Sequence, residues 1–379
     1  MERRQKIRQY ARLTEVIRFS RKSIRGLTFS LALLFLEACG AIQGNRKQID
    51  RLQTELQALE ARLRVLETDQ EQMPEVLVRA RAAVAYVRAA YTFVDDLGRP
   101  LRHVLNEAGE PIADAQGVPL VDLAGTGPIA VTEYCGTAFL VGRHGELLTN
   151  RHIAEPWWED EDSAPLLAAG LHPVFLRLRA FFEERAEPVP LEVLRVHEED
   201  IALVRTIDWT PGAEPLSLLR ESQRLEEGRR VILIGYPTGL DAMLAKLDIA
   251  EKARLEIATK GDGYAMTELL ARSNQLRASV TSGYLWEVLP NTLVYDARTA
   301  PGGSGGPLLD GHGNVVGVNE AYLPSFQGGN YAVPIQFGRL LLDGGGTEAA
   351  GPKRESPSLT KELANPQESM ISSDLLRHR

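Results

Sequence analysis

Short apolar runs recur along residues 137–333, and this pattern constrains the fold more than any other feature of the chain. The runs are three to six residues long, and most are bounded by Gly, Asn, Asp or Pro. Many short strands separated by turn residues indicate an all-β sandwich or barrel. The runs are Thr137–Val141, Leu147–Thr149, Val174–Leu178, Leu191–Val196, Ile201–Val204, Val231–Ile234, Ala278–Thr281, Leu293–Tyr295, Pro307–Leu309, Val315–Val318 and Tyr331–Val333.

Four segments depart from this strand pattern. Residues 240–276 are rich in Ala, Leu, Glu and Lys and predict one or two helices. Residues 76–90 are expected to be helical and to run into an extended segment, 91–94. Residues 95–130 are dense in Gly, Pro and Asp and predict a long surface loop, and no internal repeat is evident. Residues 344–379 hold few large apolar side chains and predict a disordered tail.

Charge is distributed unevenly along the 379 residues. The net formal charge of −8 argues against a general nucleic-acid binder. Residues 1–26 carry +7, however, which leaves −15 for the rest of the chain. Only two cysteines are present, so a disulfide scaffold is excluded, and no Cys/His cluster has the spacing of zinc ligands. A basic N-terminus before an acidic body indicates membrane topology, with the basic residues on the cytoplasmic side.

The apolar run Leu27–Leu36 follows the basic residues and has the length of a signal-peptide core, whereas a spanning helix needs about 20 residues. The next residues, Leu36-Glu37-Ala38-Cys39, resemble the lipobox of bacterial lipoproteins, which makes Cys39 a candidate lipidation site. An uncleaved anchor, an ordinary signal peptide and a buried N-terminal helix are the alternatives. We expect residues 1–41 to be a signal or anchor segment that places the protein in the bacterial envelope, facing the periplasm.

Residues 42–73 show a heptad pattern and predict a coiled coil. Ile42, Ile49, Leu56 and Leu63 are seven residues apart, and Leu52, Leu59 and Leu66 fill the second seam. Because a coiled coil cannot bury its seam alone, this segment predicts a homo-oligomer. The alternative is an amphipathic helix packed on the domain that follows Pro74.

The segment Gly302–Pro307, Gly-Gly-Ser-Gly-Gly-Pro, is the strongest local signal for chemistry. A nucleophilic serine needs an exposed hydroxyl and backbone N–H groups directed at the developing oxyanion. Glycines around Ser304 permit the tight turn this requires, so the N–H groups of Gly302 and Ser304 are the candidate oxyanion hole. A glycine-rich surface turn is the alternative interpretation.

A nucleophilic serine also needs a base and an acid that orients the base. His152 follows an apolar run in Leu148-Thr-Asn-Arg-His-Ile153 and is the candidate base. Asp200 directly precedes the apolar run Ile201–Val204 and is the candidate acid. Glu199 and Asp208 are the alternatives.

Six motifs in order resemble those of trypsin-like serine peptidases, closest to the HtrA/Deg type. The resemblance covers about residues 76–343 and implies a mainly β fold, with two six-stranded β-barrels and the active site between them. It also implies His152, Asp200 and Ser304 as base, orienting acid and nucleophile. The motifs are Cys135–Val141, Leu148–Ile153, Asp200–Val204, Val231–Pro237, Ser279–Gly283 and Asp296–Pro307, and Asn330–Ile335 resembles the last strand and the helix after it.

The chain departs from the family pattern at several points. Gly303 replaces the Asn or Asp that usually precedes the nucleophile, so activation by a new N-terminal ammonium group is not expected. The residues after position 343 are too few for the PDZ domain of many HtrA proteins. The helical segment 240–276 is expected to be an insertion. Cys135 is expected to be an inert small residue.

By resemblance, the walls of the substrate pocket are Arg298, Thr299, Asn319, Glu320 and Ala321. Arg298 stands where trypsin has an acid, which argues against cleavage after Lys or Arg. Small aliphatic residues are the expected preference, and an acidic preference through Arg298 and Thr299 is the alternative.

The predicted organisation is a segment 1–41, a coiled coil 42–73, a protease domain 74–343 and a tail 344–379. The predicted function is a serine endopeptidase acting on proteins in envelope quality control or regulated proteolysis, with no metal or organic cofactor. A catalytically silent peptide-binding scaffold and a chaperone-like protein are the alternatives, and they differ in whether Ser304 is required.

Overall fold

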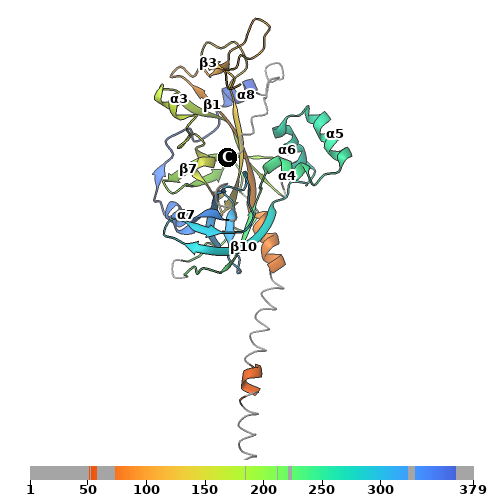
Figure 1. Ribbon diagram of the computed structural model, residues 1–379, viewed down its shortest axis with the longest axis vertical. Helices are drawn as coiled ribbons and strands as arrows, with labels where there is room; N and C mark the ends of the chain where they lie inside the picture. Colours follow the sequence, from red (N-terminus) through yellow and green to blue (C-terminus); the bar gives the residue numbers. More distant parts are fainter. Residues whose placement is uncertain are drawn as a thin grey trace, which may run out of the picture. The chain divides into compact units, whose positions relative to one another are not determined.

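A computed structural model describes residues 51, 53–57, 73–183, 185–210, 212–220, 224–322 and 329–363 (Figure 1). The chain divides into two units, Met1–Glu71 and Gln72–Arg379. The predicted segment 1–41, with Cys39, lies outside the described residues. Of the predicted coiled coil 42–73, only 51, 53–57 and 73 are described, and they are helical. Within the described ranges, none of the helices is both long enough and apolar enough to cross a membrane.

The first β-barrel has six antiparallel strands in the order β7-β6-β1-β4-β5-β8, and a β7–β8 pairing closes it. A short strand, β15 (Thr347–Glu348), adds to the outer edge of β7. The strands are β1 (Val84–Val94), β4 (Thr132–Leu140), β5 (Glu146–Thr149), β6 (His172–Phe182), β7 (Val189–His197) and β8 (Ile201–Thr206).

The second β-barrel is also closed and has six strands, in the order β10-β11-β14-β13-β12-β9. The helix α7 (Ile335–Leu342) follows its last strand. The prediction of two six-stranded barrels is therefore confirmed. The strands are β9 (Arg230–Gly235), β10 (Ser279–Val288), β11 (Leu293–Tyr295), β12 (Pro307–Leu309), β13 (Val315–Tyr322) and β14 (Asn330–Pro334).

Three apolar clusters hold these barrels. One fills the first barrel and one fills the second. The third contains Val84, Tyr86 and Phe139 from the first barrel and Ile232 and Ile234 from the second. Burial of apolar side chains from both barrels in one cluster fixes their relative placement, because each buried side chain contributes about 1.5–3 kcal/mol.

The strand β1 corrects the expectation of a helix over residues 76–90. Residues 73–82 are helical, but the chain is extended from Val84 onward, and every residue of β1 is buried. Alternate side chains face different clusters: Ala85 and Val87 lie in the core of the first barrel, whereas Tyr86 lies between the barrels. A strand buried on both faces has no polar alternation, so its Ala-rich sequence matched a helix better.

Residues 95–130 are mostly exposed, as expected of a surface loop, but they contain more regular structure than the sequence indicated. They contain a short antiparallel pair, β2 (Arg102–His103) and β3 (Val121–Asp122). They also contain three similar turns, in each of which a side-chain oxygen accepts hydrogen bonds from the backbone N–H groups two and four residues later. Asx turns of this kind order the backbone locally. The turns begin at Asp95, Asn106 and Asp114, and each has Gly three residues and Pro five residues further on.

Helices between β9 and β10 confirm the predicted helical insertion, although there are three of them rather than one or two. They are α4 (Gly239–Leu244), α5 (Ile249–Thr259) and α6 (Gly263–Arg272), and Figure 1 shows them grouped beside the barrels. A capping box of Asp248 and Glu251 begins α5, and the Asp262 carboxylate caps α6. Leu270 of α6 is buried in the cluster between the barrels.

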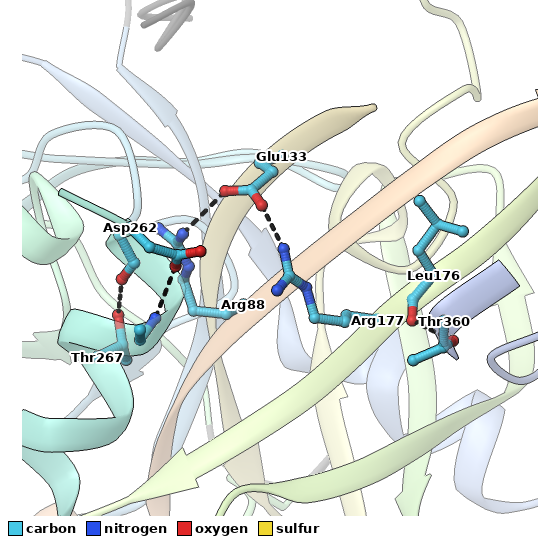
Figure 2. Close-up of polar contacts among 9 residues, drawn as sticks. Arg88, Glu133, Leu176, Arg177, Asp262, Thr267 and Thr360 are labelled. Atoms are coloured by element: carbon cyan, nitrogen blue, oxygen red, sulfur yellow. Dashed lines mark hydrogen bonds and ion pairs between the residues drawn. The ribbon is translucent and has the colours of Figure 1, made fainter. Parts of the chain in front are cut away.

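Residues 344–363 correct the expectation of a disordered tail. Besides β15, this segment contains the helix α8 (Pro357–Leu363). The Glu355 carboxylate accepts hydrogen bonds of 2.7 Å from Arg179 and of 2.9 Å from the Leu178 N–H. The Thr360 hydroxyl donates to the Leu176 carbonyl at 2.7 Å (Figure 2). Polar contacts to β6 and β7 contribute much of the order of this segment, in which Ala349 is also buried against the first barrel, so its low apolar content was misleading.

Candidate active site

His152 lies on the short helix α2 (Arg151–Ala154), directly after β5. Its Nδ1 is 2.8 Å from Asp200 Oδ2, and its backbone N–H donates to Asp200 Oδ1 at 3.0 Å. Since a carboxylate only accepts, Nδ1 carries the hydrogen and Nε2 is left as an acceptor. The arrangement fixes both the ring orientation and the tautomer that a general base needs.

Asp200 is held in an unusual backbone conformation just before β8. Asp200 has a φ of +46°, which is in the left-handed region, and only 8% of its surface is exposed. The buried Asn150 donates from Nδ2 to the Asp200 carbonyl at 2.9 Å and so supports this conformation. Of the alternative acids, Glu199 accepts a hydrogen bond from Asn291, and Asp208 is exposed. Asp200 is therefore the acid that contacts His152.

Glu320 adds a third charge to the site. Burial raises the pKa of Glu320 to about 7, and repulsion from Asp200 adds to this, while His152 opposes it. Burial lowers the pKa of His152. The charge and the hydrogen bond of Asp200 raise it, and the charge of Glu320 adds a smaller increase. The net effect is a pKa above the ordinary value of histidine. The imidazolium form of His152 is thus stabilised, as proton transfer from a nucleophile requires.

The loop that carries Ser304 is anchored to β4 of the first barrel. The Thr137 N–H donates to the Ser304 carbonyl at 2.8 Å, and the Thr137 hydroxyl donates to the Gly302 carbonyl at 2.8 Å. Gly305 has a φ of +86°, and a Cβ there would lie 1.9 Å from the Thr137 carbonyl oxygen. Only glycine fits this approach of the loop to the strand.

Two backbone N–H groups at Ser304 and two residues before it have no acceptor among the described residues. Within the described part of the chain, neither the Gly302 N–H nor the Ser304 N–H donates a hydrogen bond, whereas the Gly303 N–H donates to the Ala300 carbonyl at 2.9 Å. Unpaired N–H groups beside a serine hydroxyl are the donor set that an oxyanion hole provides. The Ser304 hydroxyl itself donates to the Glu320 carbonyl at 2.7 Å.

The predicted pocket residues differ in burial and in their contacts. Asn319 is buried and donates from Nδ2 to the Thr299 hydroxyl at 3.2 Å, and a Cβ on Gly303 would lie within 3.4 Å of both side chains. Arg298 is exposed, and its carbonyl accepts from Thr281. Ala321 lies in β13, and the structure does not describe its side chain.

Sequence reasoning missed the residues that support these groups. Thr137 holds the nucleophile loop, Asn150 holds Asp200, and the buried Tyr295 donates from its hydroxyl to Asn319 Oδ1. Thr137 lies in the motif Cys135–Val141 and Asn150 lies in the motif Leu148–Ile153. Their place in these motifs was the only sequence signal for a supporting role. Within the described ranges, no group of three or more His, Cys, Asp or Glu side chains is arranged to hold a metal ion.

A family model and several curated proteins match part of this chain. Residues 136–318 match the family model of the trypsin-like peptidase domain. Over 212 residues the chain is 27% identical to a protein named as serine protease HhoB of Synechocystis sp., covering 55% of this chain and 39% of HhoB. Over 209 residues it is 27% identical to a DegP-like periplasmic serine endoprotease of Hahella chejuensis, covering 53% of this chain and 33% of that protein. The chain thus spans well under half the length of these curated relatives.

Two solved structures that match the chain do so at low identity and low TM-score. The serine endoprotease from Yersinia pestis is 15% identical, with a TM-score of 0.40, and 71% of this chain and 65% of that chain are covered. The Rv3671c protease from M. tuberculosis is 14% identical, with a TM-score of 0.40, and 74% of this chain and 89% of that chain are covered. With its two closed β-barrels and the match of residues 136–318 to the trypsin-like peptidase model, the chain is similar to trypsin-like peptidases and, over about half of its length, to HhoB and the DegP-like endoprotease.

Proposed function

We propose that this protein is a serine endopeptidase in which Ser304, His152 and Asp200 form the catalytic triad. The observation that carries the proposal is the two-point contact between His152 and Asp200, at 2.8 Å and 3.0 Å. The Gly302 and Ser304 N–H groups, which have no acceptor among the described residues, support it. Two barrels supply the three residues, so that the site lies where they meet. Relatives named as serine proteases support the same reaction.

The proposed reaction proceeds through an acyl-enzyme. Ser304 Oγ attacks the peptide carbonyl carbon while its hydrogen passes to His152 Nε2, and the C–N bond breaks when His152 returns that hydrogen to the leaving amine. Water then attacks the ester carbonyl with His152 again as base, which releases the carboxylic acid and restores the hydroxyl. Asp200 stays ionised throughout, and the N–H groups of Gly302 and Ser304 bind the oxyanion.

The Ser304 hydroxyl donates to the Glu320 carbonyl, which favours one alternative function. A serine whose hydrogen is engaged there is not poised for transfer to His152, as in a peptide-binding protein that does not hydrolyse its ligand. In this proposal the hydroxyl rotates about χ1 between staggered rotamers and so directs its hydrogen towards His152. Substrate binding is the proposed trigger.

Casein hydrolysis separates the two functions. The wild-type protein is expected to cleave casein and Ser304→Ala is expected to lose the activity, while Ser282→Ala, at an exposed position of β10, keeps it. Equal peptide binding by wild type and Ser304→Ala without any cleavage by either would establish the binding protein instead.

We further propose an envelope location and a role in protein quality control or regulated proteolysis. The +7 charge of residues 1–26, the apolar run Leu27–Leu36 and a periplasmic DegP-like relative support it. In this proposal residues 1–41 are the signal or anchor, with Cys39 as the lipid site, and residues 42–73 form a homo-oligomeric coiled coil. Fractionation and intact mass of wild type and Cys39→Ser test the location; a cytosolic protein that retains residue 1 would refute it.

A further inference from the structure

Glu320 lies at an irregular point of β13. The strand pairs with β14 through Asn319 and through Ala321, and the register shifts between these two residues, so that Glu320 has no residue opposite it. The carbonyl of Glu320 instead accepts a hydrogen bond from the Ser304 hydroxyl at 2.7 Å. A β-bulge next to an active site commonly redirects a side chain. Here it brings Glu320 against the proposed nucleophile.

The Glu320 carboxylate lies beside the two residues proposed to activate that nucleophile. Glu320 is half-buried, and its charge interacts with those of Asp200, His152 and Glu199. Two of these three neighbours are carboxylates, so the local charge is negative. The carboxylate is one side-chain length from the carbonyl that contacts Ser304, which places it within reach of the substrate residues next to the scissile bond.

No cation of the chain pairs with this carboxylate. Among the residues that the structure describes, no Lys or Arg forms an ion pair with Glu320, and its carboxylate accepts no hydrogen bond. Arg298, the cation among the predicted pocket residues, is exposed and forms no such pair. A carboxylate partly removed from water is costly without a partner. Several other buried or half-buried glutamates have an arginine partner: the pairs are Glu155–Arg151, Glu183–Arg81, Glu192–Arg205 and Glu355–Arg179.

We propose that Glu320 is a specificity-determining residue that binds a positively charged substrate side chain next to the scissile bond. This inference deepens the proposed function and rests on it. A Lys or Arg side chain of the substrate supplies the ion pair and the charged hydrogen bond that the Glu320 carboxylate otherwise lacks. The carboxylates of Asp200 and Glu199 favour the same sign of charge. A neutral side chain of similar length leaves Glu320 unpaired, so the site discriminates by charge.

The charge of Glu320 changes near neutral pH, which gives the proposal a specific signature. Burial raises the pKa of Glu320 to about 7, with repulsion from Asp200 and Glu199 adding to this and His152 opposing it. Only the ionised carboxylate attracts a cation, and a Lys ammonium stays charged in this range. The preference for Lys is therefore expected to increase as the pH rises through 7. Titration of His152 affects all substrates alike and cancels when two peptides are compared.

The test compares alanine hexapeptides that carry one Lys with hexapeptides that carry norleucine, an uncharged side chain of similar length, at the same position. The residue is placed in turn at each of the four central positions, and mass spectrometry locates the cleaved bond. For the wild-type protein at pH 8, kcat/KM is expected to be about tenfold higher with Lys at one of these positions, as a charged hydrogen bond implies. The ratio is expected to be smaller at pH 6.

Two variants show whether the preference depends on Glu320. Glu320→Gln keeps the shape of the side chain, so its circular dichroism should match wild type, and its ratio of kcat/KM for Lys over norleucine is expected to be near one at both pH values. Glu287→Gln, at an exposed position of β10, removes the same charge elsewhere and should keep the wild-type ratio. Cleavage without a preference for Lys, or a preference that Glu320→Gln retains, would overturn the inference and leave the protease standing.

Peptide binding separates this inference from the proposed function. Ser304→Ala is expected to bind the labelled Lys peptide about tenfold more tightly than the norleucine peptide at pH 8, measured by fluorescence anisotropy. The double variant Ser304→Ala/Glu320→Gln should bind the two peptides equally. Binding that selects Lys through Glu320, without cleavage by the wild type, would refute the protease and leave the cation-binding role standing. Neither cleavage nor Lys-selective binding would overturn both.

Discussion

The Ser304 hydroxyl donates a hydrogen bond to the backbone carbonyl of Glu320 at 2.7 Å. Glu320 thereby contacts the proposed nucleophile through its backbone and influences the proposed base through its side chain, whose charge raises the pKa of His152. One residue of β13 thus couples the rotamer of the serine to the protonation of the histidine.

Asp200→Asn is expected to reduce kcat for peptide hydrolysis by about 10⁴-fold, because an amide stabilises neither the required tautomer nor the imidazolium of His152. Asp208→Asn removes an exposed carboxylate of the same chain region and is the matched control, with wild-type kcat. Steady-state kinetics on a peptide substrate measure both. Comparable rates for Asp200→Asn and wild type would assign the orienting role to another group.

Glu320→Gln is expected to move the acidic limb of the pH profile of kcat/KM to lower pH. His152 must be neutral to act as a base, and the Glu320 carboxylate raises its pKa, so removing that charge lets His152 lose its proton at lower pH. Glu320 has a pKa of about 7, so only its ionised fraction acts on His152 along this limb, and the shift is expected to be smaller than a fully ionised carboxylate would give. Glu287→Gln at an exposed position of β10 should leave the profile in place, and an unmoved limb in Glu320→Gln would contradict the electrostatic coupling.

Gly305→Ala is expected to lower the free energy of unfolding by about 2 kcal/mol or more, because its φ of +86° is strained for alanine and the new Cβ would collide with the Thr137 carbonyl. Gly311→Ala is the matched control, since a Cβ there meets no atom within 4 Å. Urea unfolding of the two variants measures the difference. Equal stabilities would show that the loop does not approach β4 as closely as described.

Glu355→Gln is expected to cost about 2 kcal/mol of unfolding free energy, because it weakens charged hydrogen bonds to Arg179 at a site where Glu355 is only 14% exposed. Glu348→Gln breaks a comparable pair with Lys353, but Glu348 is 82% exposed there, so solvent screens the pair and a much smaller cost is expected. Urea unfolding measures the free energy of unfolding of Glu355→Gln and Glu348→Gln. Equal losses in the two variants would mean that residues 344–363 do not pack on β6.

The barrels were predictable because their strands are short, apolar and separated by turn residues. β1 was not, because a strand buried on both faces loses the period of two, and Ala85, Ala89 and Ala90 favour helix by intrinsic propensity. The order of residues 344–363 depends on pairs such as Arg179–Glu355, which are 176 positions apart. No local pattern reports a contact at that separation.

For the candidate site, the sequence predicted Ser304, His152 and Asp200. Ser304 lies among glycines, and His152 and Asp200 lie at the ends of apolar runs, so each has a local signal. The sequence did not predict that Glu320 interacts with both the serine and the histidine, since β13 reaches them only after the barrel closes.

The most direct measurement of the central claim is stoichiometric labelling by a fluorophosphonate, with the labelled residue identified by mass spectrometry. The account predicts one label per chain at Ser304, no label in Ser304→Ala, and labelling at least about 10³-fold slower in His152→Ala, since the hydroxyl then has no base. No labelling of the folded wild type, labelling at another residue, or an equal rate in His152→Ala would contradict it.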